Sequence, residues 1–121
     1  MAYPVSVLAE VRDVDMPQLL AIEPAVGRVV AEIVRGLHFD PWLGQEMRER
    51  MRLDILRNCR KVPFDLPSWR GKPRFRLVYR HNPTDGSIAV ICVLAVGARS
   101  GLDAYRRAAT RLGERRRQTG V

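Results

Sequence analysis

Apolar residues near the start of the chain recur with the spacing of an amphipathic helix. Over residues 26–37 they fall at i, i+3, i+4, i+7, i+8 and i+11, which predicts a helix with one buried face. Upstream, residues 3–11 are mostly apolar and contain three valines, which predicts a first strand. Asp15 then stands where it can cap a short helix over residues 16–23. We therefore expect two helices that form an antiparallel hairpin against a sheet.

The second half of the chain has the pattern of β-strands. Residues 58–64 predict one strand, and residues 74–80 predict another because apolar and polar side chains alternate along them. The Pro- and Gly-rich residues 65–73 predict a long turn between these two strands. The segment "HNPTDG" at 81–86 combines residue types that favour turns. The apolar run over residues 88–96 is continuous, which predicts a central strand covered on both faces.

Two further helices are expected. Ser100 can cap a C-terminal helix, and Tyr105 belongs to the apolar stripe of that helix. Residues 41–56 predict another helix because apolar side chains recur there at a spacing of four. These side chains are Met47, Met51 and Ile55.

Apart from the helix over residues 41–56, the predicted order is strand, two helices, three antiparallel strands and a helix. This order indicates an α+β fold with an antiparallel sheet of about four strands, an N-terminal helical hairpin and a C-terminal helix. At 121 residues the chain has the length of one domain, so we expect a single domain over residues 1–121.

Cysteine usage and the N-terminus indicate a cytoplasmic protein. Cys59 and Cys92 are the only cysteines, which is neither a disulfide framework nor a metal-binding spacing, so we expect two reduced thiols. The N-terminus lacks a basic start followed by an apolar core, so no signal peptide is expected. The longest apolar run, at 88–96, has nine residues and is too short to span a bilayer.

Charge is divided unequally between the two halves of the chain. The net charge is +8. Residues 1–56 carry six arginines against nine carboxylates, a net charge of −3, whereas residues 57–121 carry fifteen basic residues against four carboxylates, a net charge of +11. Nineteen of the twenty-one basic residues are arginine, whose planar guanidinium group suits phosphate. This separation predicts a surface that faces a polyanion.

Three segments in order, "FRLVYR", "VLAVGAR" and "AYRRAATRL", resemble the RelE/ParE toxin superfamily. The resemblance covers residues 58–112 well and residues 3–37 by pattern only. Members are the toxic halves of toxin–antitoxin pairs, so the resemblance implies an antitoxin protein as partner. For the RelE branch it also implies cleavage of messenger RNA on the ribosome, with no metal ion and no cofactor.

The resemblance assigns candidate catalytic residues position by position. The arginine within the family's "YRLVY"-like strand matches Arg76, and the arginine that ends "VGxR" matches Arg99. The family tyrosine six residues later matches Tyr105, and a lysine on the preceding strand matches Lys61. A second family lysine would fall on Pro63, so it is missing here.

These residue types suit the cleavage of RNA by its own 2′-hydroxyl. Arg76 and Arg99 are expected to bind the phosphate oxygens and neutralise the charge that develops on them. Lys61 or Tyr105 could act as general base or acid, and Tyr105 could instead stack on a base. Five further arginines are expected to bind RNA: Arg60, Arg74, Arg80, Arg107 and Arg111.

Other interpretations compete with a nuclease. A ParE-like protein of the same fold poisons a DNA topoisomerase without cutting RNA, and a degenerate toxin would do neither. A simple nucleic-acid-binding module would use its arginines only to hold phosphates. Structural roles are also open: Tyr105 in the core, Arg76 on a solvated sheet face, and His38 and His81 at the surface. Trp69 could stack on a base or pack within the fold.

Overall fold

A sheet of five strands forms the centre of the computed structural model, which describes residues 2–47 and 54–118. The strands are β1 (Val5–Val7), β2 (Gln45–Glu46), β3 (Cys59–Phe64), β4 (Phe75–Thr84) and β5 (Ser87–Ala98). Their spatial order is β1-β5-β4-β3-β2, with β1 parallel to β5 and all other pairs antiparallel. The α+β class is therefore confirmed, with five strands in place of about four.

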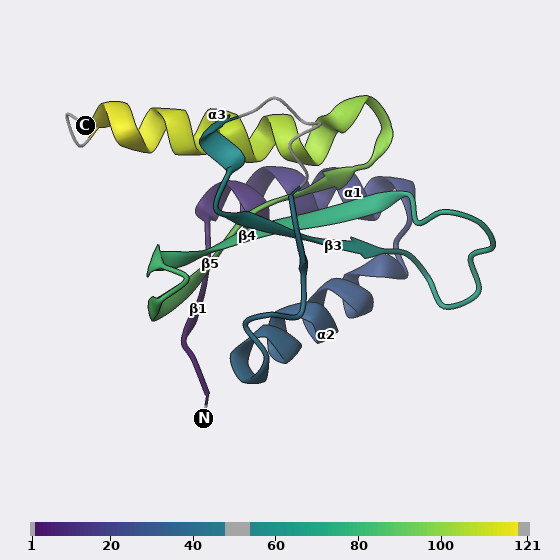
Figure 1. The fold of residues 1–121 in the computed structure, drawn as a ribbon. Helices are drawn as coiled ribbons and strands as arrows, with labels where there is room; N and C mark the ends of the chain where they lie inside the picture. The colour runs from purple at the N-terminus through teal and green to yellow at the C-terminus, as the bar shows by residue number, and fades with distance from the viewer. Residues whose placement is uncertain (1, 48–53, 119–121) are drawn as a thin grey trace.

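Helices lie on both sides of this sheet (Figure 1). The longest, α3, lies above the sheet in this view and α2 lies below it, while the segment leading into α1 contacts the β5 edge. His38 is half-buried in the last turn of α2, not in a loop, and its Nδ1 lies 2.7 Å from the Tyr3 carbonyl oxygen. The helices are α1 (Met16–Ile22), α2 (Val26–Phe39) and α3 (Asp103–Gln118), with a π-helical turn at Val11–Asp15 and 3-10 turns at Asp54–Leu56 and Ser100–Leu102.

The first strand is shorter than the prediction over residues 3–11. β1 ends at Val7, and the chain is helical from residue 9 onwards into α1. Leu8 and Val11 are both buried, and their spacing of three suits one face of a helix. Asp15 lies inside this continuous helical segment and makes no capping hydrogen bond, so its predicted role as a cap is wrong.

The turn predicted at 81–86 is much shorter in the structure. β4 continues to Thr84, which leaves only Asp85 and Gly86 between the strands. Asn82 still pairs with β5, and Pro83 follows across an irregularity in the ladder. The long partner strand offers backbone hydrogen bonds at these positions, and this pairing overrides the local preference for a turn.

Both faces of β4 are buried, although alternation predicts one polar face. Residues 75–79 are all buried, and Arg76 is only 8% exposed. The face that carries Arg76 lies under α3, whose Tyr105 is also buried. The arginine face of the sheet is therefore covered by a helix and is not a solvated surface.

His81 is buried on the opposite face of β4, so its expected place at the surface is wrong. Its ring nitrogens lie 2.8 Å from Asp85 Oδ1 and 2.7 Å from the Pro41 carbonyl oxygen. The Tyr79 hydroxyl donates to the same carbonyl at 2.8 Å and accepts from the Gly44 N–H at 2.8 Å. These bonds hold the segment that follows α2 against the sheet, and burial raises the pKa of Tyr79.

The helix predicted over residues 41–56 is wrong where the structure describes that segment. Strand β2 occupies Gln45–Glu46 and pairs with β3. The edge of β3 needs a backbone partner, and this long-range demand outweighs the local helical spacing. Met47 and Ile55 pack against the core, whereas Met51 lies outside the described residues.

Helix α3 begins later than the predicted cap at Ser100. A 3-10 turn covers Ser100–Leu102, and two of its residues, Gly101 and Leu102, have positive φ angles of 62° and 58°, so regular helix begins only after them. Asp103 is the first residue of α3, and its carboxylate accepts the Ala98 N–H at 3.1 Å. The connection between β5 and α3 is therefore a tight turn closed by Asp103.

Candidate functional site

A cleft of about 530 Å³ opens where β4 begins, β5 ends and α3 begins. All four candidate catalytic residues line it, although they come from three strands or strand ends and a helix. Of the five arginines expected to bind RNA, only Arg74 is among the lining residues. The lining consists of Lys61, Lys72, Pro73, Arg74, Arg76, Arg99, Ser100, Gly101, Leu102 and Tyr105.

Strand register brings the cations of the cleft together. Arg76 lies opposite Gly97 on one side and opposite Pro63 on the other. Lys61 is two residues from Pro63 along β3, so it lies on the same face of the sheet as Arg76. Arg99 follows the end of β5, and its N–H donates to the Arg74 carbonyl at 2.7 Å.

Gly97 allows α3 to start close to the end of β5. A Cβ atom at this position would lie 2.5 Å from Asp103 Oδ2 and 3.3 Å from the backbone of Ala104. A side chain at this position would require the Asp103 carboxylate to move and the start of α3 to shift by a few tenths of an ångström. The short turn that results places Tyr105 at the cleft beside Arg99, and Tyr105 is both 3% exposed and a lining residue.

Arg76 is a buried cation without a carboxylate partner in the part of the chain that the structure describes. Its Nη1 donates to the carbonyl oxygens of Pro73 at 3.0 Å and Phe75 at 2.8 Å, while its buried Nε has no hydrogen-bond partner there. Arg99 is exposed, and none of the described carboxylates pairs with it. A buried unpaired charge is costly, so this cleft is suited to an anion.

Lys72 is a cleft residue that the sequence did not single out. It comes from the long turn between β3 and β4, next to Gly71, whose φ is +104°. The available signal was weak, because a lysine in a polar turn is usually solvated. Lys72 nevertheless brings a second ammonium group to the cleft, beside that of Lys61.

Arg74 lines the cleft but is engaged by carboxylates. Its Nε and Nη2 donate to Asp65 at 2.9 and 2.8 Å, and Nη2 also donates to Glu23 at 3.2 Å. Hydrogen bonds from the Arg74 side chain lower the pKa of Asp65 to about 2. Arg74 therefore differs from Arg76, because its charge is already balanced within the protein.

Arg60 and Arg80 lie away from the cleft. Arg60 Nη1 donates to the Gly44 carbonyl at 3.0 Å, and its guanidinium lies 4.8 Å from the centre of the Trp42 ring. Arg80 is half-buried on β4, opposite Cys59 on β3 and Cys92 on β5. Both thiols are free and buried, and burial raises the pKa of Cys59 to about 11.

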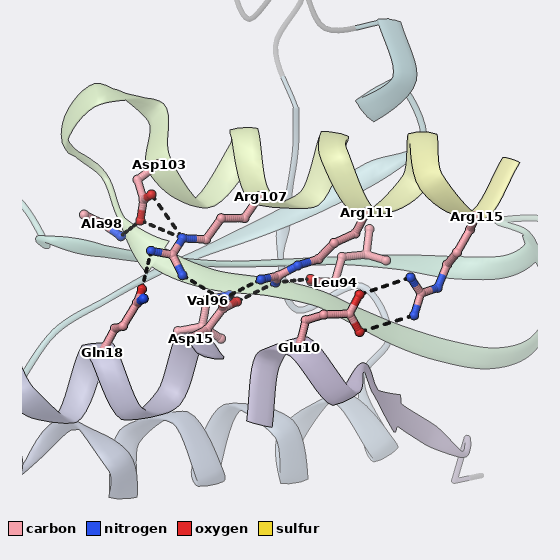
Figure 2. A network of polar contacts seen from close by, with 10 residues as sticks. All are labelled: Glu10, Asp15, Gln18, Leu94, Val96, Ala98, Asp103, Arg107, Arg111 and Arg115. Carbon is pink, nitrogen blue, oxygen red and sulfur yellow. Dashed lines mark hydrogen bonds and ion pairs between the residues drawn. The ribbon is translucent and has the colours of Figure 1, made fainter. Parts of the chain in front are cut away.

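Arg107 and Arg111 belong to a polar network along the edge of β5 (Figure 2). Because β1 ends early, the last part of this edge has no neighbouring strand, and side chains replace it. Arg111 Nη1 donates to the Leu94 carbonyl at 2.9 Å, and the Val96 N–H donates to Asp15 Oδ2 at 2.9 Å.

Asp15 is the centre of this network. Arg111 donates to its two oxygens at 2.6 and 2.7 Å, and Arg107 donates to it at 2.7 Å. Burial alone raises the pKa of Asp15, but hydrogen bonds from Arg111, Val96 and Arg107 outweigh burial and hold the pKa below its ordinary value. Asp103 and Gln18 also accept from Arg107, and Glu10 accepts from Arg115 farther along α3 (Figure 2).

Neither a membrane helix nor a cluster of metal ligands was found in the described ranges. No helix there is both long and apolar enough to cross a membrane. No three His, Cys, Asp or Glu side chains within the same ranges converge as metal ligands would.

Comparisons with known proteins identify the fold. No protein-family model matches the chain, and no curated protein matches it by sequence. Among solved structures, the chain is similar to the free state of a double arginine-to-alanine mutant of the E. coli toxin RelE. The TM-score is 0.59 at 20% sequence identity, and the match covers 92% of this chain and 98% of that one. The chain therefore has a RelE-like fold, in agreement with the resemblance in its sequence.

Proposed function

We propose that this chain is the toxin of a type II toxin–antitoxin pair and cleaves messenger RNA on the ribosome. The observation that supports this most strongly is the cleft itself, where Arg76 and Arg99 have no carboxylate partner among the described residues and Lys61, Lys72 and Tyr105 are neighbours. Burial of Arg76 without a carboxylate partner costs stability, so a role in binding an anion explains it better than a role in folding.

In the proposed reaction, the 2′-oxygen of one nucleotide bonds to the adjacent phosphorus and the bond from phosphorus to the 5′-oxygen breaks. Arg76 and Arg99 bind the non-bridging oxygens and stabilise the extra negative charge of the transition state. A base takes the proton of the 2′-hydroxyl, and an acid delivers a proton to the departing 5′-oxygen. An amine or a phenolate can accept the first proton and an ammonium or a phenol can donate the second, so the proposed reaction needs no metal ion.

Lys61 and Tyr105 are the candidates for base and acid. Both side chains line the cleft together with Arg76 and Arg99, so either can reach a phosphate bound there. Tyr105→Phe and Lys61→Met each remove one proton-transfer group while preserving size. The substitution that flattens the low-pH limb of the cleavage rate identifies the base.

The expected partner of this protein is an antitoxin, and we expect the two to meet in the cytoplasm. The cleft is cationic, and residues 57–121 carry a net charge of +11, so a segment with acidic side chains would complement it. A disordered antitoxin segment that folds on binding would cover the cleft and block access of RNA.

The proposal is tested by expressing the protein in cells and mapping the 5′ ends of translated messages. Wild type is compared with Arg76→Ala and Arg99→Ala, and Arg28→Ala on the exposed face of α2 serves as the matched control. We expect new ends within codons for wild type and control. Loss of one transition-state contact should lower cleavage about 10²–10³-fold in each cleft variant.

Three outcomes would contradict the nuclease. Growth arrest with intact messages would favour a topoisomerase poison or another target, and normal growth with intact messages would indicate a degenerate toxin. If purified protein binds RNA without cutting it on ribosomes, a simple binding module is the better description.

A further inference from the structure

Trp69 projects from the long turn between β3 and β4 and is 43% exposed. One face of its ring lies over the Arg74 guanidinium, with 3.6 Å from Arg74 Cζ to the ring centre. The indole N–H donates to the Lys72 carbonyl at 3.1 Å. The ring is thus fixed in orientation, although it lies outside the core.

The turn that carries Trp69 is anchored at both ends. Asp65 accepts the N–H groups of Leu66 at 2.8 Å and Arg74 at 2.9 Å, and the Trp69 N–H donates to the Leu66 carbonyl at 3.0 Å. Arg74 is held in turn by Asp65 and Glu23. Because these carboxylates balance its charge, Arg74 serves as a rigid support for the indole.

The indole ring of Trp69 contacts Lys72 and Arg74, and both of these residues line the cationic cleft. Among the described residues, only the Arg74 guanidinium stacks on the Trp69 indole, and no aromatic ring does. The second face of the indole therefore has no stacking partner in the described chain. Proteins that bind single-stranded nucleic acids use cationic side chains to contact the phosphate backbone and aromatic rings to stack on the bases. A fixed aromatic ring at the border of a cationic cleft has this arrangement.

We infer that Trp69 is a base-stacking subsite, which binds the base of a nucleotide next to the phosphate held by Arg76 and Arg99. This inference rests on the proposed function and adds a contact that phosphate binding does not require. Stacking accepts any base, since every base has a π-face. Trp69 therefore positions the strand along the cleft and does not select a particular base.

The two tryptophans of the chain allow a direct optical test. Trp42→Phe keeps an aromatic ring beside His81 and leaves Trp69 as the single indole fluorophore. This protein is titrated at low salt with a short RNA oligonucleotide and, separately, with an abasic oligomer of the same length. We expect the base-containing oligonucleotide to quench Trp69 emission and the abasic oligomer to bind without quenching.

Substitution at Trp69 provides the second measurement. Trp69→Ala should weaken binding of the base-containing oligonucleotide about tenfold and leave binding of the abasic oligomer unchanged, whereas Trp69→Tyr should restore most of the loss. Arg76→Ala is the matched control and should weaken both oligomers, because it removes a phosphate contact.

The outcomes separate the two proposals. Unchanged Trp69 emission while RNA is bound, or equal quenching by both oligomers, would overturn the stacking subsite. If Arg76→Ala still weakens both oligomers in that case, the phosphate cleft of the proposed function stands. Failure of both oligomers to bind, even at low salt, would overturn the stacking subsite, whereas the proposed cleavage on the ribosome is decided separately by the mapping of 5′ ends.

Discussion

Arg111 on α3 and Arg76 on β4 are almost equally buried, at 7% and 8% exposure, but their guanidinium groups meet opposite surroundings. Arg111 donates twice to Asp15 and once to the Leu94 carbonyl. Arg76 has two backbone carbonyls, an Nε without a partner and no carboxylate among the described residues. The arginine on α3 is therefore neutralised by a carboxylate and stabilises the fold, whereas the arginine on β4 is buried without a neutralising carboxylate among the described residues.

This difference assigns the basic residues to two tasks. Arg111 and Asp15 bond the free edge of β5, and Asp15, Asp103 and Glu10 pair with Arg107, Arg111 and Arg115 of α3. The cleft brings cations together, and two of them, Arg76 and Arg99, have no carboxylate partner among the described residues, which is the environment that an anionic ligand would complement. Net charge alone would count both groups as a polyanion-binding surface.

The largest expected effect is on stability, from Asp15→Asn. This change leaves Arg111 buried without its counter-ion and should lower the free energy of unfolding by about 3–5 kcal/mol. Urea denaturation measures the loss. Asp13→Asn is the matched control, since Asp13 is exposed and pairs only with its neighbour Arg12 in the described chain. Equal stability of both variants would contradict the structural role of the network.

A pair of arginine substitutions sharpens the comparison. Arg107→Met removes hydrogen bonds to Asp15 and Asp103 and should cost about 1–3 kcal/mol of unfolding free energy. Arg76→Met removes a buried charge that no described carboxylate balances, so stability should be unchanged or higher, while RNA binding should lose about one unit of salt slope. Thermal unfolding of both variants measures the difference. A larger loss of stability for Arg76→Met than for Arg107→Met would contradict the conclusion that Arg107 is paired within the fold and Arg76 is not.

Acid should weaken the carboxylate-paired regions and leave the arginines charged. The folded-state pKa of Asp65 is about 2, and those of Asp15 and Glu10 are also lowered. Below roughly pH 4 the unfolded chain therefore binds more protons than the native state, so stability falls as pH drops towards 2. Unfolding followed at stepwise lower pH tests this. Asp65→Asn should flatten part of the dependence, and an unaltered profile would contradict the ion pair.

Local sequence patterns predicted one helix and three strands correctly. The amphipathic spacing at 26–37 became α2, and the strands at 58–64, 74–80 and 88–96 became β3, β4 and β5. The motifs also named Lys61, Arg76, Arg99 and Tyr105, which line one cleft, while their catalytic roles stay predictions. The early end of β1, the extension of β4 and the strand β2 depend on long-range backbone pairing, which local spacing does not encode.

The sequence by itself predicted α2, the strands β3, β4 and β5, and four residues of the cleft, because each depends on a short segment with its own periodicity or motif. Only the tertiary structure decided which cations are paired. Asp15 meets Arg111 across 96 residues of sequence, and Arg74 meets Glu23 across 51, so no local pattern reports these contacts. Whether a charge stabilises the fold or awaits a ligand depends on what lies beside it after folding, since Coulomb energy depends on distance and solvation rather than on composition.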